Sequence, residues 1–113
     1  MLFRSLKEVQ RARALRPEWE AAALLESQLQ QKNSGQAAID TLSGYLQKYP
    51  NAREIRLNYA RLLVSEKRFG EARSQFQKLL SDFPGNTEVV YAVALLSVQL
   101  NDYTLAEIGR AHV

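Results

Sequence analysis

The sequence of 113 residues has no cysteine, which excludes disulfide scaffolds, thiolate nucleophiles and cysteine-ligated metal sites. It has one histidine, His112, so the usual general base for activating a nucleophile is nearly absent. The longest stretch poor in polar residues, 89–100, is shorter than the roughly 20 residues that a membrane helix needs. No membrane span is therefore expected in this segment. The remaining composition, with 46% hydrophobic and 24% charged residues, is typical of one globular domain.

Enzyme motifs are also missing, because the sequence contains no P-loop, GxGxxG, HExxH or nucleophile elbow. Glu18 and Glu20 lie beside alanines on an expected helix, where a solvated surface explains them better than acid–base chemistry. Asp40, Asp82 and Asp102 lie at unrelated positions and do not form a metal-ligand pattern. We therefore expect no catalysis, no cofactor and no metal.

The few prolines are regularly spaced. Pro17, Pro50 and Pro84 recur at intervals of about 33 to 34 residues, and each follows an apolar helical pattern, as expected where a helix must stop. Alanines recur with the same period, at Ala38, Ala72 and Ala106. The chain is therefore predicted to repeat one unit of this length.

Each unit holds two helical patterns joined by a short turn. In the middle unit, apolar residues recur at steps of three and four over residues 59–66 and 72–80, which predicts two amphipathic helices. Asn51 and Glu54 have the spacing of a capping box, which predicts the start of the first helix. The expected helices span residues 6–15, 19–31, 36–48, 53–66, 70–82 and 87–100, with turns at 33–35, 67–70 and 101–103 and a seventh helix from Tyr103.

Helix pairs of about 34 residues, with alanine early in the second helix and proline after it, resemble the tetratricopeptide repeat. The resemblance implies an all-α, right-handed superhelical solenoid of antiparallel helix pairs. It makes residues 1–113 a single array of about two complete repeats with a half repeat at each end. The parts are 6–17 as the second helix of a broken repeat, 19–50 and 53–84 as complete repeats, and 87–106 as the start of a further repeat.

Some positions depart from the family pattern. Ala60 and Ala94 match the small residue that the family has where paired helices approach closely. Glu26 stands at this position in the first complete unit, and Gly35 replaces the turn aromatic that is Phe69 in the next unit. These departures concern the packing of the first unit more than the fold.

The two termini are similar to a translated sequencing adapter. Residues 2–5 can be encoded by codons whose reverse complement, in another frame, encodes residues 107–111, and the adapter continues into codons for residues 112 and 113. We therefore expect residues 1–5 and 107–113 to be foreign, and residues 6–106 to be a segment of a longer, bacterial-type protein. Cytoplasm and periplasm or envelope both stay open as its compartment.

The resemblance implies a protein–protein interaction scaffold that binds a peptide or a helical segment of a partner on its concave surface. Basic residues that cluster on the first helix, such as Lys7, Arg11 and Arg13, leave an alternative open, an RNA-binding helical repeat of the pentatricopeptide type, whose unit has about 35 residues. The shorter proline intervals disfavour it, and acidic residues such as Glu8, Glu54 and Glu71 dilute the positive field. Another protein is therefore the expected partner, and nucleic acid is the less favoured one.

The candidate groove is the side of each first helix that is left free after packing. In the middle unit Ala60 and Leu63 are expected to meet the second helix, so the stripe turned away from them faces a partner. The lysine and asparagine clamp of some family members is not matched, with Asn58 alone near such a position. In an alternative that stays open, Tyr91 and Leu95 pack against further repeats. The candidate groove residues are Glu54, Leu57, Asn58, Arg61, Val64, Glu88, Tyr91, Leu95 and Val98.

Residues 89–100 are apolar nearly all round, a pattern typical of helices that are buried on several sides. In a repeat array each unit buries its apolar face only against its neighbours, and about three stacked units are normally required for stability. We therefore expect the isolated chain to unfold easily or to self-associate through this end.

Overall fold

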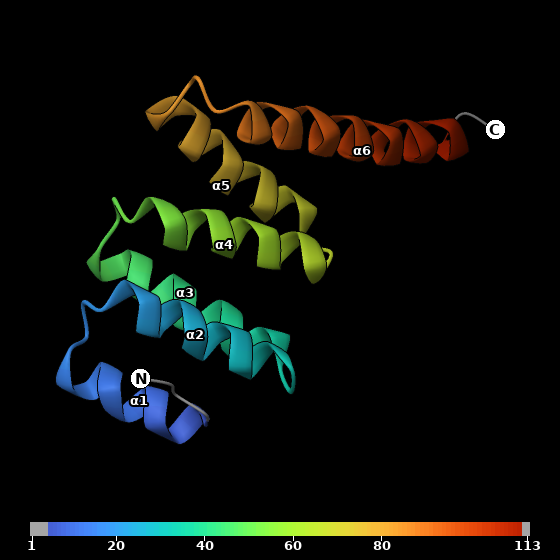
Figure 1. The fold of residues 1–113 in the computed structure, drawn as a ribbon. Coiled ribbons are helices and arrows are strands. Elements are labelled where there is room, and N and C mark those ends of the chain that lie inside the picture. Colours follow the sequence, from blue (N-terminus) through green and yellow to red (C-terminus); the bar gives the residue numbers. More distant parts are fainter. Residues whose placement is uncertain (1–4, 112–113) are drawn as a thin grey trace.

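The structure of the protein, a computed structural model, describes the backbone of residues 5–111 and the side chains of residues 5–100. This part of the chain is helical, without strands (Figure 1). The helices are α1 (Leu6–Leu15), α2 (Glu20–Gln31), α3 (Gly35–Lys48), α4 (Arg53–Ser65), α5 (Phe69–Asp82) and α6 (Thr87–Ala111). The predicted all-α fold is confirmed, and the first five helices begin and end within one residue of their predicted bounds.

The helices stack in chain order, each packed against the next in a roughly antiparallel arrangement (Figure 1). α2 also contacts α4, and no other pair of non-consecutive helices packs together in the described part of the chain. The resulting body is elongated, with extents of 58 × 32 × 21 Å. Its radius of gyration is 16.6 Å, whereas a compact domain of this length has about 13 Å. The predicted helical repeat solenoid is confirmed.

Three helices end at the same point of the repeat, immediately before a proline. Arg16, Tyr49 and Phe83 have φ between −137° and −129° and ψ between 71° and 79°. The ring of a following proline disfavours the helical region for the preceding residue, which explains the shared conformation. The N–H of each residue still donates to the carbonyl four residues earlier, at 2.8 to 2.9 Å. The regular prolines therefore set where α1, α3 and α5 end.

α4 begins at the predicted residue, Arg53, but its cap differs from the prediction. Its N-cap is Ala52, which has no side-chain oxygen, and the Ala52 N–H donates to the Tyr49 carbonyl at 3.2 Å. The capping box predicted at Asn51 and Glu54 is wrong, because this turn around Pro50 makes Ala52 the N-cap in place of Asn51. Glu54 still lies in the first turn, where a carboxylate interacts favourably with the helix dipole.

The core runs continuously through the stack. Ala38, Ala60 and Ala72 are fully buried, as expected for small residues at close helix approaches. Leu42 and Phe76, one repeat apart in the sequence, are the large buried side chains at the same place in successive units. The core cluster comprises Ala23, Ala38, Ile39, Leu42, Tyr45, Leu46, Ile55, Leu57, Ala60, Leu62, Leu63, Ala72, Phe76, Leu79, Val89 and Leu96.

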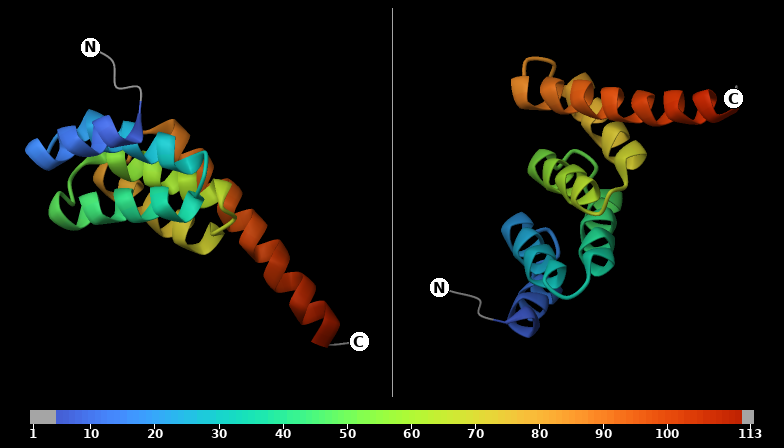
Figure 2. Two further views of the ribbon diagram at one scale, coloured as in Figure 1. Left: turned by 90° about the horizontal axis from the view of Figure 1, so that it is seen from below. Right: turned by 90° about the vertical axis from the view of Figure 1, so that its right-hand side faces the viewer.

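The last helix is longer than predicted. The turn expected at 101–103 and the seventh helix from Tyr103 are wrong, because α6 continues from Thr87 to Ala111. The alternative to a turn for residues 101–111 is to extend the helix that is already formed. Continuing the same helix satisfies their backbone groups with ordinary helical hydrogen bonds and needs no new helix nucleus. As a result α6 extends well past the other helices (Figure 2).

Candidate functional site

Over residues 87–100, α6 is covered on one side only. Val89 and Leu96 are buried in the core cluster, where α6 packs on α5. The neighbouring stripe stays in contact with water, with Tyr91 68% and Leu95 53% exposed. Ala94 is exposed as well, although its equivalent one repeat earlier is buried. Clustered large apolar side chains that remain exposed mark a candidate interaction surface.

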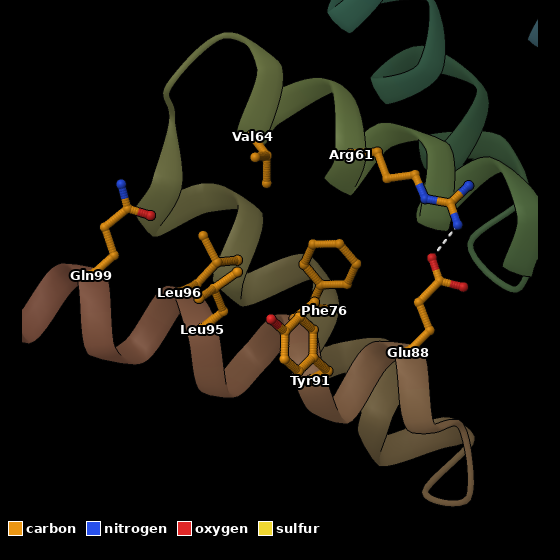
Figure 3. A pocket seen from close by; sticks show the side chains of 9 residues that line it. Arg61, Val64, Phe76, Glu88, Tyr91, Leu95, Leu96 and Gln99 are labelled. Atoms are coloured by element: carbon orange, nitrogen blue, oxygen red, sulfur yellow. Dashed lines mark hydrogen bonds and ion pairs between the residues drawn. The ribbon is translucent and has the colours of Figure 1, made fainter.

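An open groove of about 310 Å³ lies along this stripe, between α4 and α6 (Figure 3). α4 and α6 do not pack on each other anywhere in the described part of the chain, so the groove is not closed by helix contact. Phe76 of α5 lies at its base, Val64 of α4 points toward it, and Tyr91 and Leu95 line the α6 side. The remaining lining residues are Arg61, Glu88, Ala92, Leu96 and Gln99. We name this the α4–α6 groove.

One ion pair crosses the end of the α4–α6 groove. The guanidinium Nη2 of Arg61 on α4 donates to the carboxylate Oε1 of Glu88 on α6 (Figure 3). The two side chains are 51% and 55% exposed, and an ion pair in such a position contributes only about 0 to 1 kcal/mol. Arg61 can therefore exchange Glu88 for another carboxylate with little loss of free energy.

A second hollow, of about 180 Å³, lies one repeat earlier. It is lined by Leu42 of α3, which is equivalent to Phe76, and by residues of α2 and α4. Gln28, Gln31 and Asn58 bring side-chain amides to its walls. Arg61 lines this hollow as well as the α4–α6 groove. We name it the α2–α4 hollow; its other lining residues are Ser27 and Leu62.

The structure brings five of the nine candidate residues together in the α4–α6 groove: Arg61, Val64, Glu88, Tyr91 and Leu95. Asn58 lines the α2–α4 hollow instead, and its amide donates to the Glu54 carbonyl at 2.8 Å. Glu54 and Val98 are exposed but line neither hollow.

Leu57 does not have the exposed position that was expected of it. It is 8% exposed and belongs to the core cluster. The expectation counted only the packing of α4 on α5, whereas α4 also packs on α3 and contacts α2. A helix packed on three neighbours has a narrower free face, so Leu57 is not available as an anchor for a partner.

Sequence reasoning missed part of the groove. Phe76, Ala92 and Leu96 were not among the candidate groove residues, yet they form its base and part of its α6 wall. The repeat period predicts that Phe76 and Leu42 lie at equivalent positions of successive units. It does not predict how far apart α4 and α6 lie. That distance depends on how α5 separates the two helices.

Few charged side chains line the α4–α6 groove. Arg61 and Glu88 are the only charged residues in its lining, and they pair with each other. Among the described residues, no three histidine, cysteine or acidic side chains are grouped as metal ligands would be. None of the described helices combines the length and apolar character needed to cross a membrane. What the groove offers a partner is mainly apolar surface.

Comparisons with known proteins agree with this architecture. A family model described as "Tetratricopeptide repeat" matches residues 20–96. Among solved structures, "MamA MSR-1 C2" superimposes with a TM-score of 0.67 at 22% sequence identity, over 89% of this chain and 59% of that one. The chain thus spans less than two thirds of the length of this structural neighbour. No curated protein matches the sequence. The family match and the shared fold show that this chain belongs to the tetratricopeptide repeat family, whose non-catalytic helical arrays bind other proteins.

Proposed function

We propose that the chain binds a segment of a partner protein in the α4–α6 groove. The observation that carries the proposal is the pair of exposed side chains Tyr91 and Leu95 beside an open groove with Phe76 at its base. The groove lies on the face formed by the first helices of the units, α2, α4 and α6, which is the face expected to be concave. Apolar side chains of the partner would remove this surface from water.

The expected energetics are those of a small interface with a few strong anchors. Full burial of a leucine-sized side chain contributes about 1.5 to 3 kcal/mol, and tyrosine is among the residues that most often dominate binding. Val64 and Phe76 form a preformed apolar wall and base, so the partner does not have to order them on binding. Tyr91 and Leu95 are therefore the proposed anchors.

The RNA-binding alternative has less support. Five cations, Arg13, Arg16, Arg61, Arg68 and Lys78, already form ion pairs with carboxylates. RNA phosphates would have to compete with these internal partners for the cations. A filter-binding assay with single-stranded RNA at physiological salt tests this alternative directly, and we expect no retention.

A displayed library of random peptides, selected on the immobilised chain, tests the proposal although the natural partner is unidentified. We expect the selected peptides to lose at least about tenfold in affinity, about 1.4 kcal/mol, on Tyr91→Ala or Leu95→Ala. Val90→Ala is the matched control, because Val90 is an exposed apolar residue of the same helix that does not line the groove. Undiminished binding by both groove variants, with unchanged helicity by circular dichroism, would place the binding site elsewhere.

A further inference from the structure

The α2–α4 hollow and the α4–α6 groove are equivalent places in successive repeats. Their matching lining residues lie one repeat, about 34 residues, apart along the sequence. Leu42 and Phe76 lie at the two bases, and Leu62 and Leu96 are the apolar residues beside them. Three wall residues of the α2–α4 hollow also have equivalents in the α4–α6 groove: Ser27 corresponds to Arg61, Asn58 to Ala92, and Arg61 to Leu95. The array therefore presents the same kind of hollow twice, one repeat apart.

The walls of the two hollows differ in chemistry. The α2–α4 hollow has the amides of Gln28, Gln31 and Asn58 and no acidic residue among its lining side chains. Its only charge is the guanidinium of Arg61. In the α4–α6 groove the equivalents of Asn58 and Arg61 are Ala92 and Leu95, so this wall is apolar. One hollow suits a hydrogen-bonding anionic group, and the other suits an aliphatic or aromatic side chain.

Arg61 lies at the boundary between the two hollows, because its side chain lines both. In the free chain it pairs with Glu88 across the end of the α4–α6 groove. A carboxylate of the partner can replace Glu88, since the exposed pair contributes little free energy. The planar guanidinium can also hold a carboxylate through two parallel hydrogen bonds, an arrangement that is stronger than a single neutral contact.

The distance between the hollows sets the spacing of the groups that would fill them. The two hollows lie on either side of α4, and a helix with its side chains is about 10 to 12 Å across, so the hollows are separated by a similar distance. An extended chain advances about 3.3 Å per residue. A carboxylate at one hollow and an apolar side chain in the other would therefore be about three residues apart in an extended segment.

From this register and charge complementarity we propose that the partner is an extended segment with two features. An aspartate or glutamate meets Arg61 beside the amides of the α2–α4 hollow. A leucine-like or aromatic side chain, about three residues away, enters the α4–α6 groove. This inference rests on the proposed function and adds the chemical class of the partner, an acidic–apolar peptide.

The same peptide selection tests this pattern when its sequences are read out. We expect peptides enriched for an acidic residue about three positions from a large apolar one. Selection on the Arg61→Gln chain should keep the apolar preference and lose the acidic one, because the apolar groove wall is unchanged. Replacing the acidic residue of a selected peptide by its amide should weaken binding to the unsubstituted chain by at least about fivefold.

Glu88→Gln is the matched control for Arg61→Gln. It removes the internal competitor for the guanidinium, so binding of the acidic peptides should become tighter rather than weaker. Enriched peptides that depend on Tyr91 but show no acidic preference would leave the proposed function standing and overturn this inference. An acidic preference that survives Arg61→Gln would overturn it as well. If no peptide is enriched, or if binding does not depend on Tyr91 and Leu95, the proposed function fails and this inference fails with it.

Discussion

Arg13 of α1 donates a hydrogen bond from Nη1 to the carboxylate Oε1 of Glu26 on α2, and this ion pair holds the first two helices together. The Glu26 side chain is only 8% exposed and that of Arg13 is 23% exposed. One repeat later the equivalent positions are held by Leu46 and Ala60, both buried in the core. The array therefore uses a buried ion pair where the next unit uses apolar packing.

Each partner of this pair should depend on the other for its burial. We expect Arg13→Leu to cost about 3 kcal/mol, because it leaves the Glu26 carboxylate buried and unpaired. Glu26→Ala should cost less, about 2 kcal/mol, because Arg13 can extend toward water. Urea denaturation followed by circular dichroism measures both.

The double variant Arg13→Leu with Glu26→Ala is the decisive comparison. It gives positions 13 and 26 the residue types that the next unit has at Leu46 and Ala60. Its free energy of unfolding should therefore lie within about 1 kcal/mol of that of the starting chain. If instead the two single losses add up in the double variant, the pair is not coupled in the way the structure indicates.

Lys67 introduces strain into the turn between α4 and α5. Its φ is 62°, in the left-handed region that residues with a Cβ disfavour, while its N–H donates to the Val64 carbonyl at 2.9 Å. We expect Lys67→Gly to raise the free energy of unfolding by about 0.5 to 1 kcal/mol. Glu66→Gly is the control, because Glu66 has a φ of −91° and gains no such relief. Equal effects of the two substitutions on thermal unfolding would contradict this account.

Tyr45 connects α3 to the start of α2. Its phenol Oη donates to the Glu18 carbonyl at 2.7 Å, and the side chain is buried. Tyr45→Phe should cost about 1 kcal/mol at neutral pH, because it removes this hydrogen bond and leaves the carbonyl without that donor. Thermal unfolding of the two chains at neutral pH measures the difference.

The stability difference between the Tyr45 chain and Tyr45→Phe should also depend on pH. Burial, and secondarily the charge of Glu20, raises the pKa of the Tyr45 phenol above the ordinary value of 10.0. The folded state then keeps the proton at a pH where the unfolded state loses it, so the contribution is full below pH 10.0 and falls as the pH rises above it. The stability advantage of tyrosine over phenylalanine should therefore shrink in alkaline unfolding experiments. If the stability advantage of tyrosine over phenylalanine instead grew with pH, the pKa of Tyr45 in the folded state would have to be lowered and not raised.

Leu57 and Tyr91 occupy equivalent repeat positions but should respond differently to truncation. Leu57→Ala removes a buried side chain and should cost about 2 to 4 kcal/mol of stability. Tyr91 is 68% exposed, so Tyr91→Ala should change the free energy of unfolding by less than about 0.5 kcal/mol while weakening peptide binding. Measuring thermal unfolding and peptide affinity on the same two variants separates a packing role from a binding role.

The exposed stripe on α6 should also promote association between chains. We expect light scattering to detect oligomers that grow with concentration, because Val90, Leu95 and Val98 remain in water on one helix. Val90→Lys with Val98→Lys should reduce this association without loss of helicity. A strictly monomeric chain at all concentrations would show that the stripe does not attract a second copy.

The repeat period explains most of what could be predicted from the sequence. Pro17, Pro50 and Pro84 identify the helix ends because proline acts on its immediate neighbour, and the buried alanines follow from the same period. The capping box of α4 was mispredicted because a backbone hydrogen bond to Tyr49, which leaves no sequence signal, takes the place of the Asn51 cap.

The candidate site was only partly predictable, for a different reason. Helical spacing indicates which side chains share a face, and it brought Arg61, Tyr91 and Leu95 into one candidate set. Helical spacing does not show how many other helices pack against a given helix. Leu57 is buried because α4 packs on three neighbours. The pairing of Arg13 with Glu26 likewise depends on how α1 lies on α2, and this placement is a property of the packed helices.

The nearest-neighbour packing of the helices has a consequence for how quickly the chain finds its fold. Because consecutive helices make nearly all the contacts, the contacting residues are close in sequence and little loop entropy is lost before each contact forms. Helical proteins with such local contacts fold in about microseconds to milliseconds. The most extensive contacts are those of α2 with α3 and of α4 with α5, so we expect these two helix pairs to form first. From there the structure would grow outward in both directions, with α1 and α6 the last to join and the first to detach.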